Sequence, residues 1–430
     1  MNITVVGLGK IGLPLAAQYA LRGHDVTGVD ISSRVVDLVN SGIEPFPGEA
    51  GLDVALRDVV ATGRLSATTS YETAIPSADV VVVVVPLFVD DEARPDFGWM
   101  DAATRSIGEH LTAGTLVAYE TTLPVGTTRS RWKPLLEQVS GLVEGHDFHV
   151  AFSPERVLTG RVFADLRRYP KLVGALSGAG ARAARHFYES VLEFNDRPDL
   201  VRANGVWDLG SAEAAEMAKL AETTYRDVNI GLANELARFA EKSRIDVASV
   251  IEACNSQPYS HIHTPGIAVG GHCIPVYPRL YLWNDPEATI VRAARARNAS
   301  MPDHAVTLLA ALQPDIAGKT VAILGAAYRG GVKETAFSGV FDTVRAVEAL
   351  GAVPLVHDPL YDDDELAALG FTPFHRGDAA DAAILQADHV DYLGWSATDV
   401  DGLATIVDGR RVLDPAAWAP AAYTAIGRGA

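Results

Sequence analysis

A glycine-rich segment near position 270 places a cysteine beside sterically open backbone. It reads Gly-Ile-Ala-Val-Gly-Gly-His-Cys-Ile-Pro from Gly266 to Pro275, with the thiol at Cys273. A thiolate is the most nucleophilic side chain near neutral pH, and glycines let a ligand approach backbone N–H groups closely. The pattern is typical of covalent chemistry on a bulky carbonyl compound. The alternative is that Cys273 is a small buried apolar residue, the common state of a free cysteine.

The beginning of the chain has the pattern of a dinucleotide-binding unit. A β-branched run at 3–6 leads into Gly-Leu-Gly-Lys-Ile-Gly at 7–12, then a helix-like stretch at 13–21 and a second strand at 25–29 that ends at Asp30. The first two glycines permit a tight turn and a pyrophosphate at a helix N-terminus, and the third lets the helix pack on the sheet. Asp30 would accept hydrogen bonds from the adenosine ribose hydroxyls and would repel a 2′-phosphate, so we expect NAD rather than NADP. A purely structural βαβ unit is the alternative.

Composition limits the class of protein. The 430 residues are 48% hydrophobic and 21% charged, which indicates a globular chain of two or three domains. The net charge of −18 and the lack of a Lys- or Arg-rich run argue against a nucleic-acid partner. Only Cys254 and Cys273 occur, so we expect a reducing compartment, the cytoplasm. The N-terminus lacks a signal-peptide pattern, and no apolar run is long enough to cross a bilayer, so we expect no membrane partner.

Alternating strand and helix patterns predict an α/β protein. Further strands are expected at 80–85, 115–119, 148–152 and 171–174. A long proline-free stretch at 211–242 predicts one long helix that joins two halves and offers a dimer face. Helices are also expected at 245–254 and 287–312, and the acidic patch from Asp362 to Glu365 is typical of a solvated helix start.

A second strand–glycine–helix pattern starts at Gly318, and its second strand ends at Asp358 as the first unit ends at Asp30. We therefore expect two Rossmann-like doubly wound domains joined by a long central helix and a helical middle domain. The expected division is an NAD-binding domain at 1–205, a central dimerisation domain with the cysteine loop at 206–315, and a C-terminal Rossmann-like domain at 316–430.

Several spaced motifs together resemble one enzyme family. They are Tyr119-Glu-Thr-Thr122-Leu-Pro-Val-Gly126-Thr-Thr128, Ser153-Pro-Glu155-Arg156-Val-Leu158, Ala214-Ala-Glu216-Met-Ala-Lys219-Leu, Arg226-Asp-Val-Asn229 and Gly270-Gly-His-Cys273-Ile-Pro275. With the two Rossmann patterns, the chain resembles the UDP-glucose/GDP-mannose dehydrogenases over essentially its whole length. The motifs are most similar to the branch that oxidises UDP-N-acetylmannosamine or UDP-N-acetylglucosamine.

The resemblance implies NAD-dependent oxidation of the C6 hydroxyl of a UDP-hexose, foremost a UDP-N-acetylhexosamine, to a uronate for polysaccharide biosynthesis by a homodimer. Cys273 would form a thiohemiacetal and then a thioester. Lys219 would stabilise the oxyanion, and Glu155 would activate water. Thr122 would hydrogen-bond that water or the substrate. The alternatives are that Lys219 is a solvated lysine on an amphipathic helix, that Glu155 is a surface carboxylate and that Thr122 is an ordinary loop hydroxyl.

The resemblance also implies that the C-terminal domain at 316–430 binds the UDP-sugar, and it implies individual binding residues. Cofactor contacts are expected from Gly7, Gly9, Lys10, Ile11, Gly12, Asp30, Arg34, Pro86 and Thr122. Substrate contacts are expected from Glu155, Arg156, Val157, Leu158, Lys219, Thr223, Ile262, His263, Gly266, Gly270 and Arg329. Arg329 takes the place of a family lysine and could pair with a pyrophosphate. His261, His263 and His272 lack the ligand set of a zinc site, so we expect no metal.

The chain also departs from the family pattern. Tyr277 and Thr223 stand where an aspartate and an asparagine support the lysine and the catalytic water. Further departures are Pro86-Leu87-Phe88, Tyr259, Ala268 and Ala336-Phe337-Ser338. Two alternatives therefore stay open. The enzyme stops at the aldehyde or takes a differently decorated nucleotide sugar, or the protein binds a nucleotide sugar without catalysis.

Overall fold

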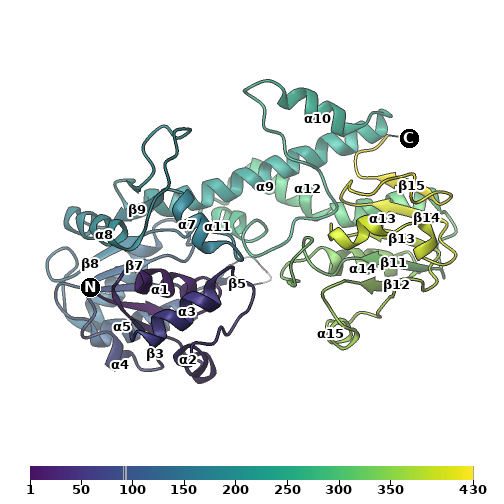
Figure 1. The fold of residues 1–430 in the computed structure, drawn as a ribbon. Coiled ribbons are helices and arrows are strands. Elements are labelled where there is room, and N and C mark those ends of the chain that lie inside the picture. Colours follow the sequence, from purple (N-terminus) through teal and green to yellow (C-terminus); the bar gives the residue numbers. More distant parts are fainter. Residues whose placement is uncertain (91, 93, 430) are drawn as a thin grey trace. The chain divides into compact units, whose positions relative to one another are not determined.

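The structure is a computed structural model that describes residues 1–90, 92 and 94–429. The chain divides into two units, Met1–Ala221 and Glu222–Ala430, each of which is described by itself. The long helix α9 (Ala212–Lys242) starts in unit 1 and ends in unit 2 (Figure 1). It is the predicted helix of 211–242, and the Ser211 hydroxyl accepts from Ala214 N in its first turn.

Unit 1 is built on one sheet in the order β10-β9-β8-β7-β4-β1-β2-β3. Its strands are β1 (Asn2–Val6), β2 (Asp25–Val29), β3 (Leu65–Thr68), β4 (Val80–Val83), β7 (Leu116–Tyr119), β8 (His149–Phe152), β9 (Lys171–Ala175) and β10 (Val206–Asp208). Six neighbouring strands of this sheet, β8-β7-β4-β1-β2-β3, are parallel. They follow the Rossmann order, in which the direction of strand progression reverses between β1 and β4. β9 runs antiparallel to β8. β3 and β10 are absent from the prediction.

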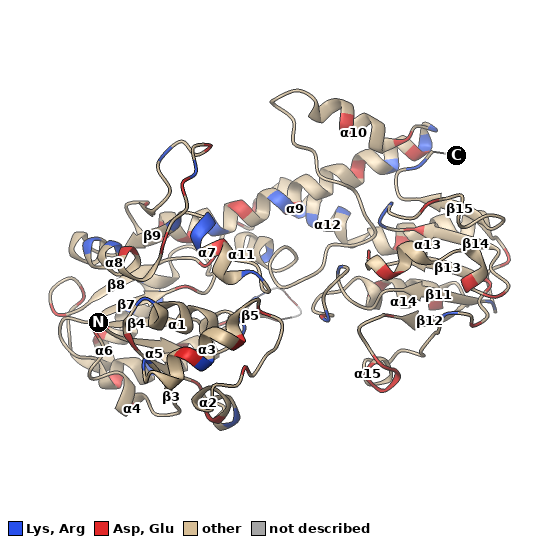
Figure 2. Cartoon of the chain, in the orientation of Figure 1, with Lys and Arg blue, Asp and Glu red and all other residues tan. Residues whose placement is uncertain are grey.

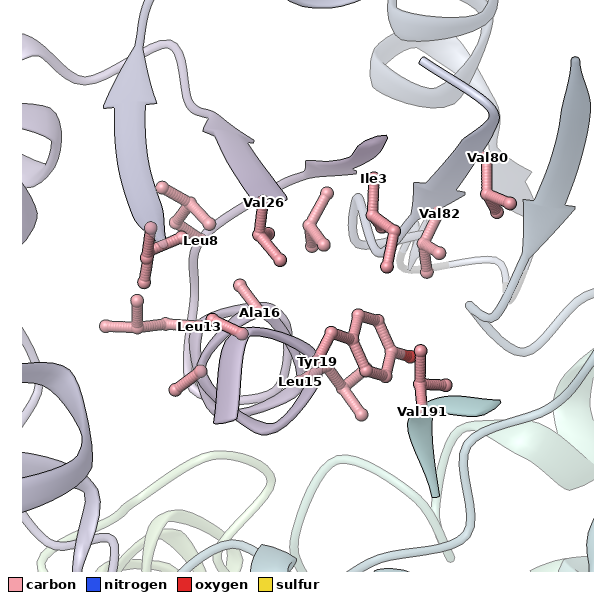
Figure 3. Close-up of a cluster of buried hydrophobic side chains, with 14 of the residues drawn as sticks. Ile3, Leu8, Leu13, Leu15, Ala16, Tyr19, Val26, Val80, Val82 and Val191 are labelled. Carbon is pink, nitrogen blue, oxygen red and sulfur yellow. The ribbon is translucent and has the colours of Figure 1, made fainter. Parts of the chain in front are cut away.

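The helices of unit 1 connect and cover these strands. They are α1 (Gly12–Leu21), α2 (Ser33–Asn40), α3 (Leu52–Ala61), α4 (Tyr71–Ala74), α5 (Gly98–His110), the π-helix η1 (Thr128–Trp132), α6 (Lys133–Ser140), α7 (Val162–Arg168) and α8 (Gly178–Val191). A short hairpin pairs β5 (Phe88–Val89) with β6 (Pro95–Asp96). Figure 3 shows how α1 packs: Ala16 and Tyr19 lie under Ile3, Val26 and Val82 of the strands. Apolar burial on both sheet faces explains the unbroken valine run of β4.

Unit 2 contains a five-stranded parallel sheet in the order β12-β11-β13-β14-β15. Its strands are β11 (Thr320–Leu324), β12 (Val353–His357), β13 (Ala382–Leu385), β14 (Thr405–Asp408) and β15 (Ala422–Ala425). Its helices after α9 are α10 (Val247–Asn255), α11 (Tyr277–Asn284), α12 (Thr289–Ala299), α13 (Met301–Leu312), α14 (Val340–Ala349), α15 (Asp363–Ala368), and the 3₁₀-helices η2 (Val390–Gly394) and η3 (Ala397–Asp399). This strand order is the other common doubly wound order, so the predicted fold class is confirmed.

Two local predictions have different outcomes. The acidic patch is a helix start: Asp362 and Glu365 form a reciprocal capping box at α15. The single helix predicted for 287–312 is wrong, because α12 and α13 are separated at Ser300. Pro302 explains the break, since it has no N–H to donate and its ring clashes with the preceding turn.

The described residues contain no helix whose length and apolarity would suffice to cross a membrane. In the ribbon of Figure 2, basic and acidic residues are interspersed along the chain in both units.

Candidate functional site

The glycine turn after β1 is the candidate nucleotide site of unit 1. Gly7 has a φ of +94°, and its N–H donates to Val29 O at 2.8 Å. A Cβ at Gly12 would lie 1.8 Å from Gly7 O, so glycine is needed for α1 to begin so close to the turn. A Cβ at Gly9 would meet no atom within 4 Å. Packing therefore explains Gly7 and Gly12, whereas Gly9 leaves open space at the start of α1.

Asp30 braces this turn from the end of β2. Its two carboxylate oxygens accept hydrogen bonds from the backbone N–H groups of Leu8 and Ser32, each at an N···O distance of 2.9 Å. A carboxylate oxygen has a second lone pair, so Asp30 retains the capacity to accept ribose hydroxyls. The first turn of α1 has neither a side-chain cap nor an acidic residue. The helix N-terminus therefore favours an anion there.

The other predicted cofactor residues lie on neighbouring segments of unit 1. Lys10 and Pro86 are exposed, and Ile11 is half-buried. Arg34 is exposed on α2. Thr122 is buried just beyond the end of β7. Because β1, β2, β4 and β7 are parallel, the segments that follow them share one sheet edge, where doubly wound proteins bind ligands.

The same edge of unit 1 holds a buried charged cluster around Lys171. The Lys171 ammonium donates to Glu120 Oε2 and to Glu155 Oε2, both at 2.7 Å. Glu155 Oε1 accepts Arg156 N at 2.6 Å. The Tyr188 hydroxyl donates to Glu120 Oε1 at 2.7 Å, and Tyr19 lies 3.4 Å from the same oxygen. Glu155 is thus a fixed, nearly buried carboxylate, and the alternative of a surface carboxylate is wrong.

Burial and charge act in opposite directions on this cluster. Burial raises the pKa of Glu120 to about 7, although the Lys171 ammonium opposes the shift. Burial also acts to raise the pKa of Glu155, but Lys171 and the hydrogen bonds to the carboxylate outweigh it, so the pKa lies below its usual value. Burial acts to lower the pKa of Lys171, and the two carboxylates raise it overall. Glu155 is therefore the ionised partner, and Glu120 is the one that takes up a proton near neutral pH.

The segment predicted to contact the nucleotide, Arg156–Leu158, follows Glu155 and is tied to the rest of unit 1. Arg156 Nη1 donates to Pro170 O at 3.3 Å, and Leu158 N donates to Asp165 Oδ2 at 3.1 Å. The next turn is held by a buried carboxylate, because Glu49 accepts Gly160 N and Val162 N at 2.6 Å each. A small cavity of about 10 Å³ is lined by Glu155, Arg156 and Val157 among others. It has room for about one water molecule.

Lys219 and Thr223 lie one turn apart on α9. Lys219 is 5% exposed and Thr223 is fully buried. The alternative of a solvated lysine is therefore wrong, since lysine is rarely buried unless its charge has a use or a partner. Glu216, one turn earlier, accepts Gly126 N at 2.6 Å and both Thr128 N and the Thr128 hydroxyl, at 2.9 and 2.6 Å.

The cysteine loop lies in unit 2, and its glycines have a packing role. A Cβ at Gly270 would lie 2.5 Å from Tyr328 Cβ and 2.9 Å from Phe337 O. Gly271 has a φ of +87° and faces the Tyr328 ring. Tyr328 and Phe337 of the same unit therefore fill the positions that a Cβ would take at these two glycines. Cys273 is partly exposed, and its carbonyl accepts Tyr277 N at 3.0 Å at the start of α11.

Three asparagines of unit 2 position the predicted substrate loop at 262–266. Asn229 Oδ1 accepts His263 N at 3.0 Å, and Asn234 Oδ1 accepts Gly266 N at 3.0 Å. Asn255 Oδ1 accepts Ile262 N at 2.8 Å.

The remaining predicted groups of unit 2 can be placed as well. Arg329 is exposed beside Tyr328, with its guanidinium 5.8 Å from the ring centre. His272 lies 3.8 Å from Glu334. Burial, and secondarily Arg226, lowers the pKa of His263. Within the described residues, no group of three or more His, Cys, Asp or Glu could hold a metal ion.

Sequence reasoning missed Lys171 and the role of Glu120. Lys171 begins an apolar strand, and Glu120 directly follows one. A charged residue at each strand end was the available signal. The contact of Lys171 with the two glutamates could not be predicted from the sequence. It requires β9 to run antiparallel to β8, which places the start of β9 beside the segment that follows β8.

Comparison with known proteins is consistent across the chain. Residues 1–192 match the NAD binding domain of the UDP-glucose/GDP-mannose dehydrogenase family, and residues 213–300 match its central domain. A UDP-N-acetyl-D-mannosamine dehydrogenase of Pyrococcus horikoshii is 36% identical over 96% of both chains. An NDP-N-acetyl-D-galactosaminuronic acid dehydrogenase of Ralstonia nicotianae is 33% identical over 91% of both.

Solved structures give the same result. A UDP-N-acetylmannosamine dehydrogenase structure from Pyrococcus horikoshii has a TM-score of 0.88 at 34% identity and covers both chains fully. One from Staphylococcus aureus has a TM-score of 0.83 at 30% identity and covers 99% of this chain and 98% of that one. Through both of its matched domains and over nearly its full length, the chain belongs to the UDP-glucose/GDP-mannose dehydrogenase family of nucleotide-sugar dehydrogenases.

Proposed function

We propose that this protein oxidises the C6 hydroxyl of a UDP-N-acetylhexosamine to the uronate with NAD. The observation that carries the proposal is the ionised Glu155 at the sheet edge that also bears the Gly7–Gly12 turn. The substrate choice is supported by the names of the relatives, several of which are UDP-N-acetyl-D-mannosamine dehydrogenases.

The proposed cofactor fits the residues of unit 1. The open position at Gly9 and the uncapped start of α1 would receive the pyrophosphate, and Asp30 would accept the ribose hydroxyls. When bound, NAD supplies a hydride acceptor. Because a carboxylate repels a 2′-phosphate, we expect kcat/KM to be at least about tenfold higher with NAD than with NADP. Equal values for the two cofactors would contradict this assignment of Asp30.

The proposed reaction divides between a nucleophile and an acid–base group. Loss of a hydride from C6 and of the hydroxyl proton to solvent converts the C6 alcohol into an aldehyde, and the Cys273 thiolate adds to the carbonyl carbon to form a thiohemiacetal oxyanion. Loss of a second hydride gives a thioester. Glu155 takes one proton from the water that attacks the thioester carbonyl, and the tetrahedral intermediate expels the Cys273 thiolate. The carboxylic acid that results releases its remaining proton to solvent and becomes the carboxylate. The Lys219 ammonium stabilises the oxyanion, an effect of about 2.7–4 kcal/mol for one such donor.

The test is a panel of UDP- and GDP-sugars with NAD, in which NADH per sugar and product mass are measured. The native protein should yield two NADH per UDP-N-acetylhexosamine and the uronate. Cys273→Ser should bind the UDP-sugar and lose uronate formation, because a serine hydroxyl is hardly ionised at neutral pH. Cys254→Ser, the matched control at the other free cysteine, should retain activity. Near-normal uronate formation by Cys273→Ser would contradict thioester chemistry.

Tyr277 and Thr223 favour a second candidate, oxidation that releases aldehyde. A tyrosine, with a pKa of about 10, cannot accept a proton at pH 7 as a carboxylate can. If the family aspartate supports the lysine and the water, Tyr277→Asp with Thr223→Asn should raise acid formation. Two NADH per sugar at ordinary rates in the native protein would exclude this candidate.

We also propose a homodimer formed through α9, the three-domain division at 1–205, 206–315 and 316–430, and a cytoplasmic location. What supports the dimer is a stripe on α9 in unit 2. Tyr225, Leu232 and Phe239 are 55%, 50% and 67% exposed and recur every seven residues, close to two helical turns. The cytoplasmic location rests on the two unpaired cysteines.

A further inference from the structure

Lys171 is a buried charge that the proposed reaction does not use. It is 5% exposed at the first position of β9 and bridges Glu120 and Glu155. The trio carries one positive and two negative charges when all three groups are ionised. Buried charges are costly unless they are paired, so the geometry of each group depends on the other two.

Lys171 is itself held from several elements of unit 1. The titratable or charged groups that face it are Glu120 after β7, Glu155 after β8, Tyr188 of α8, whose ring centre lies 4.9 Å from the ammonium, and, through Glu120, Tyr19 of α1. Tyr188 and Tyr19 approach Glu120 Oε1, which leaves Oε2 for Lys171. The ammonium therefore has a defined position, and it directs Oε2 of Glu155.

We propose that Lys171 is the positioning residue for Glu155: it keeps this carboxylate ionised and oriented for water activation, and Glu120 is its buried counter-charge. This inference rests on the proposed role of Glu155 in thioester hydrolysis. In this proposal Lys171 acts through Glu155 and not on the substrate. Its effect belongs to the hydrolysis step and not to either hydride transfer.

Removal of the ammonium would leave two neighbouring buried carboxylates. Burial then disfavours the ionised form of both, so Glu155 would be protonated over a wider pH range and would act as a base only at higher pH. Lys171→Met should slow thioester hydrolysis at pH 7 by about a hundredfold, the scale of a lost general base. The acidic limb of the hydrolysis rate should move upward by about one pH unit or more.

The experiment measures acyl-enzyme at Cys273 by intact-protein mass spectrometry after mixing with UDP-sugar and NAD, across pH. Lys171→Met should accumulate acyl-enzyme, whereas Lys171→Arg, which keeps the charge, should restore hydrolysis and the native pH limb. Lys171→Met with Glu120→Gln removes the buried repulsion and protects folding, and it should still accumulate acyl-enzyme. Lys133→Met, which removes a partly exposed lysine 3.8 Å from Glu137, is the matched control.

Two outcomes would separate the inference from the proposed function. If Glu155→Gln accumulates acyl-enzyme but the Lys171→Met/Glu120→Gln protein hydrolyses it at the native rate and pH limb, the role of Lys171 is wrong and that of Glu155 stands. If Glu155→Gln hydrolyses normally, or no acyl-enzyme forms in any variant, the roles of both residues are wrong.

Discussion

The three glycines of the nucleotide turn are explained by different physical constraints. Gly7 is required by its φ of +94°, and Gly12 by the 1.8 Å approach of a Cβ to Gly7 O. Gly9 has neither constraint, since a Cβ added there would have no atom within 4 Å and its φ is not in the left-handed region. A ligand is therefore the physical reason that we infer for glycine at position 9.

We predict that Gly9→Ala retains the stability of the native protein and weakens NAD binding about tenfold, or about 1.4 kcal/mol. The added methyl would occupy the space through which the pyrophosphate approaches. NAD affinity is measured by calorimetry and stability by thermal unfolding. Gly394→Ala, also without an atom within 4 Å of the new Cβ, is the control and should change neither. Unchanged NAD affinity in Gly9→Ala would contradict the assigned site.

At the scale of elements, α9 anchors loops of both units by side-chain hydrogen bonds. In unit 1 its Glu216 holds the turn from Gly126 to Thr128. In unit 2 its Asn229 and Asn234 hold the predicted substrate loop. The helix thus fixes loop positions as well as carrying Lys219.

Loosening the substrate loop should affect binding more than chemistry. Asn229 donates to His261 O at 2.6 Å and accepts His263 N at 3.0 Å. Asn229→Ala removes these two bonds to the loop, each worth about 1 kcal/mol, and a third bond to the Tyr225 hydroxyl at 3.0 Å. We therefore predict a rise of about tenfold in KM for the UDP-sugar with a smaller change in kcat. Asn204→Ala is the control, because it removes a side-chain hydrogen bond to the Asn195 carbonyl in unit 1 and does not affect the loop of unit 2. An unchanged KM for Asn229→Ala would show that this loop does not bind the sugar nucleotide.

Glu216 should make stability depend on pH. Burial, the largest cause, raises its pKa from 4.5 to about 7. Between these values the folded state retains a proton that the unfolded state has released, so this group's contribution is full below pH 4.5 and is lost as pH rises to about 7. Glu216→Gln removes this dependence.

We therefore predict that the stability difference between native protein and Glu216→Gln falls by about 3 kcal/mol from pH 4.5 to pH 7.5. Urea unfolding of both proteins at several pH values measures it. Glu213→Gln, at a partly exposed carboxylate paired with Arg129, should show no such fall. A difference that does not vary with pH would contradict the assignment.

Over the whole chain, the net charge of −18 agrees with a protein that acts on small molecules and not on nucleic acid. The proposed dimer rests on the apolar stripe on α9, formed by Tyr225, Leu232 and Phe239. The apolar stripe on α9 is too regular to be scattered surface residues, since its members recur at a spacing that keeps them on one helix face. Burying it against a second copy would remove three large side chains from water.

We predict that Leu232→Asp with Phe239→Asp converts a dimer into a monomer. Two charges in an apolar interface would be desolvated without partners. Analytical ultracentrifugation measures the mass, and circular dichroism verifies folding. Val201→Asp, at an apolar residue that is 94% exposed in unit 1, is the control and should leave the dimer intact. A native protein that sediments as a monomer would contradict the predicted dimer.

Features that depend on local order could be predicted from the sequence. The turn at 7–12 and Asp30 follow from residue type and spacing along one βαβ unit, and α9 follows from a long run without proline that Ser211 begins. The break at Ser300 was also encoded locally, by Pro302, and could have been predicted.

Which distant side chains meet depends on the tertiary fold and could not be predicted. Lys171 reaches Glu155 and Glu120 because β9 runs antiparallel to β8, and strand direction depends on pairing between segments that no local pattern specifies. The burial of Lys219, and the occupation of the space at Gly270 by Tyr328, likewise depend on packing between residues far apart in the chain. Local propensity selects the elements, but non-local packing sets burial, and burial sets the charge state of the groups that could do chemistry.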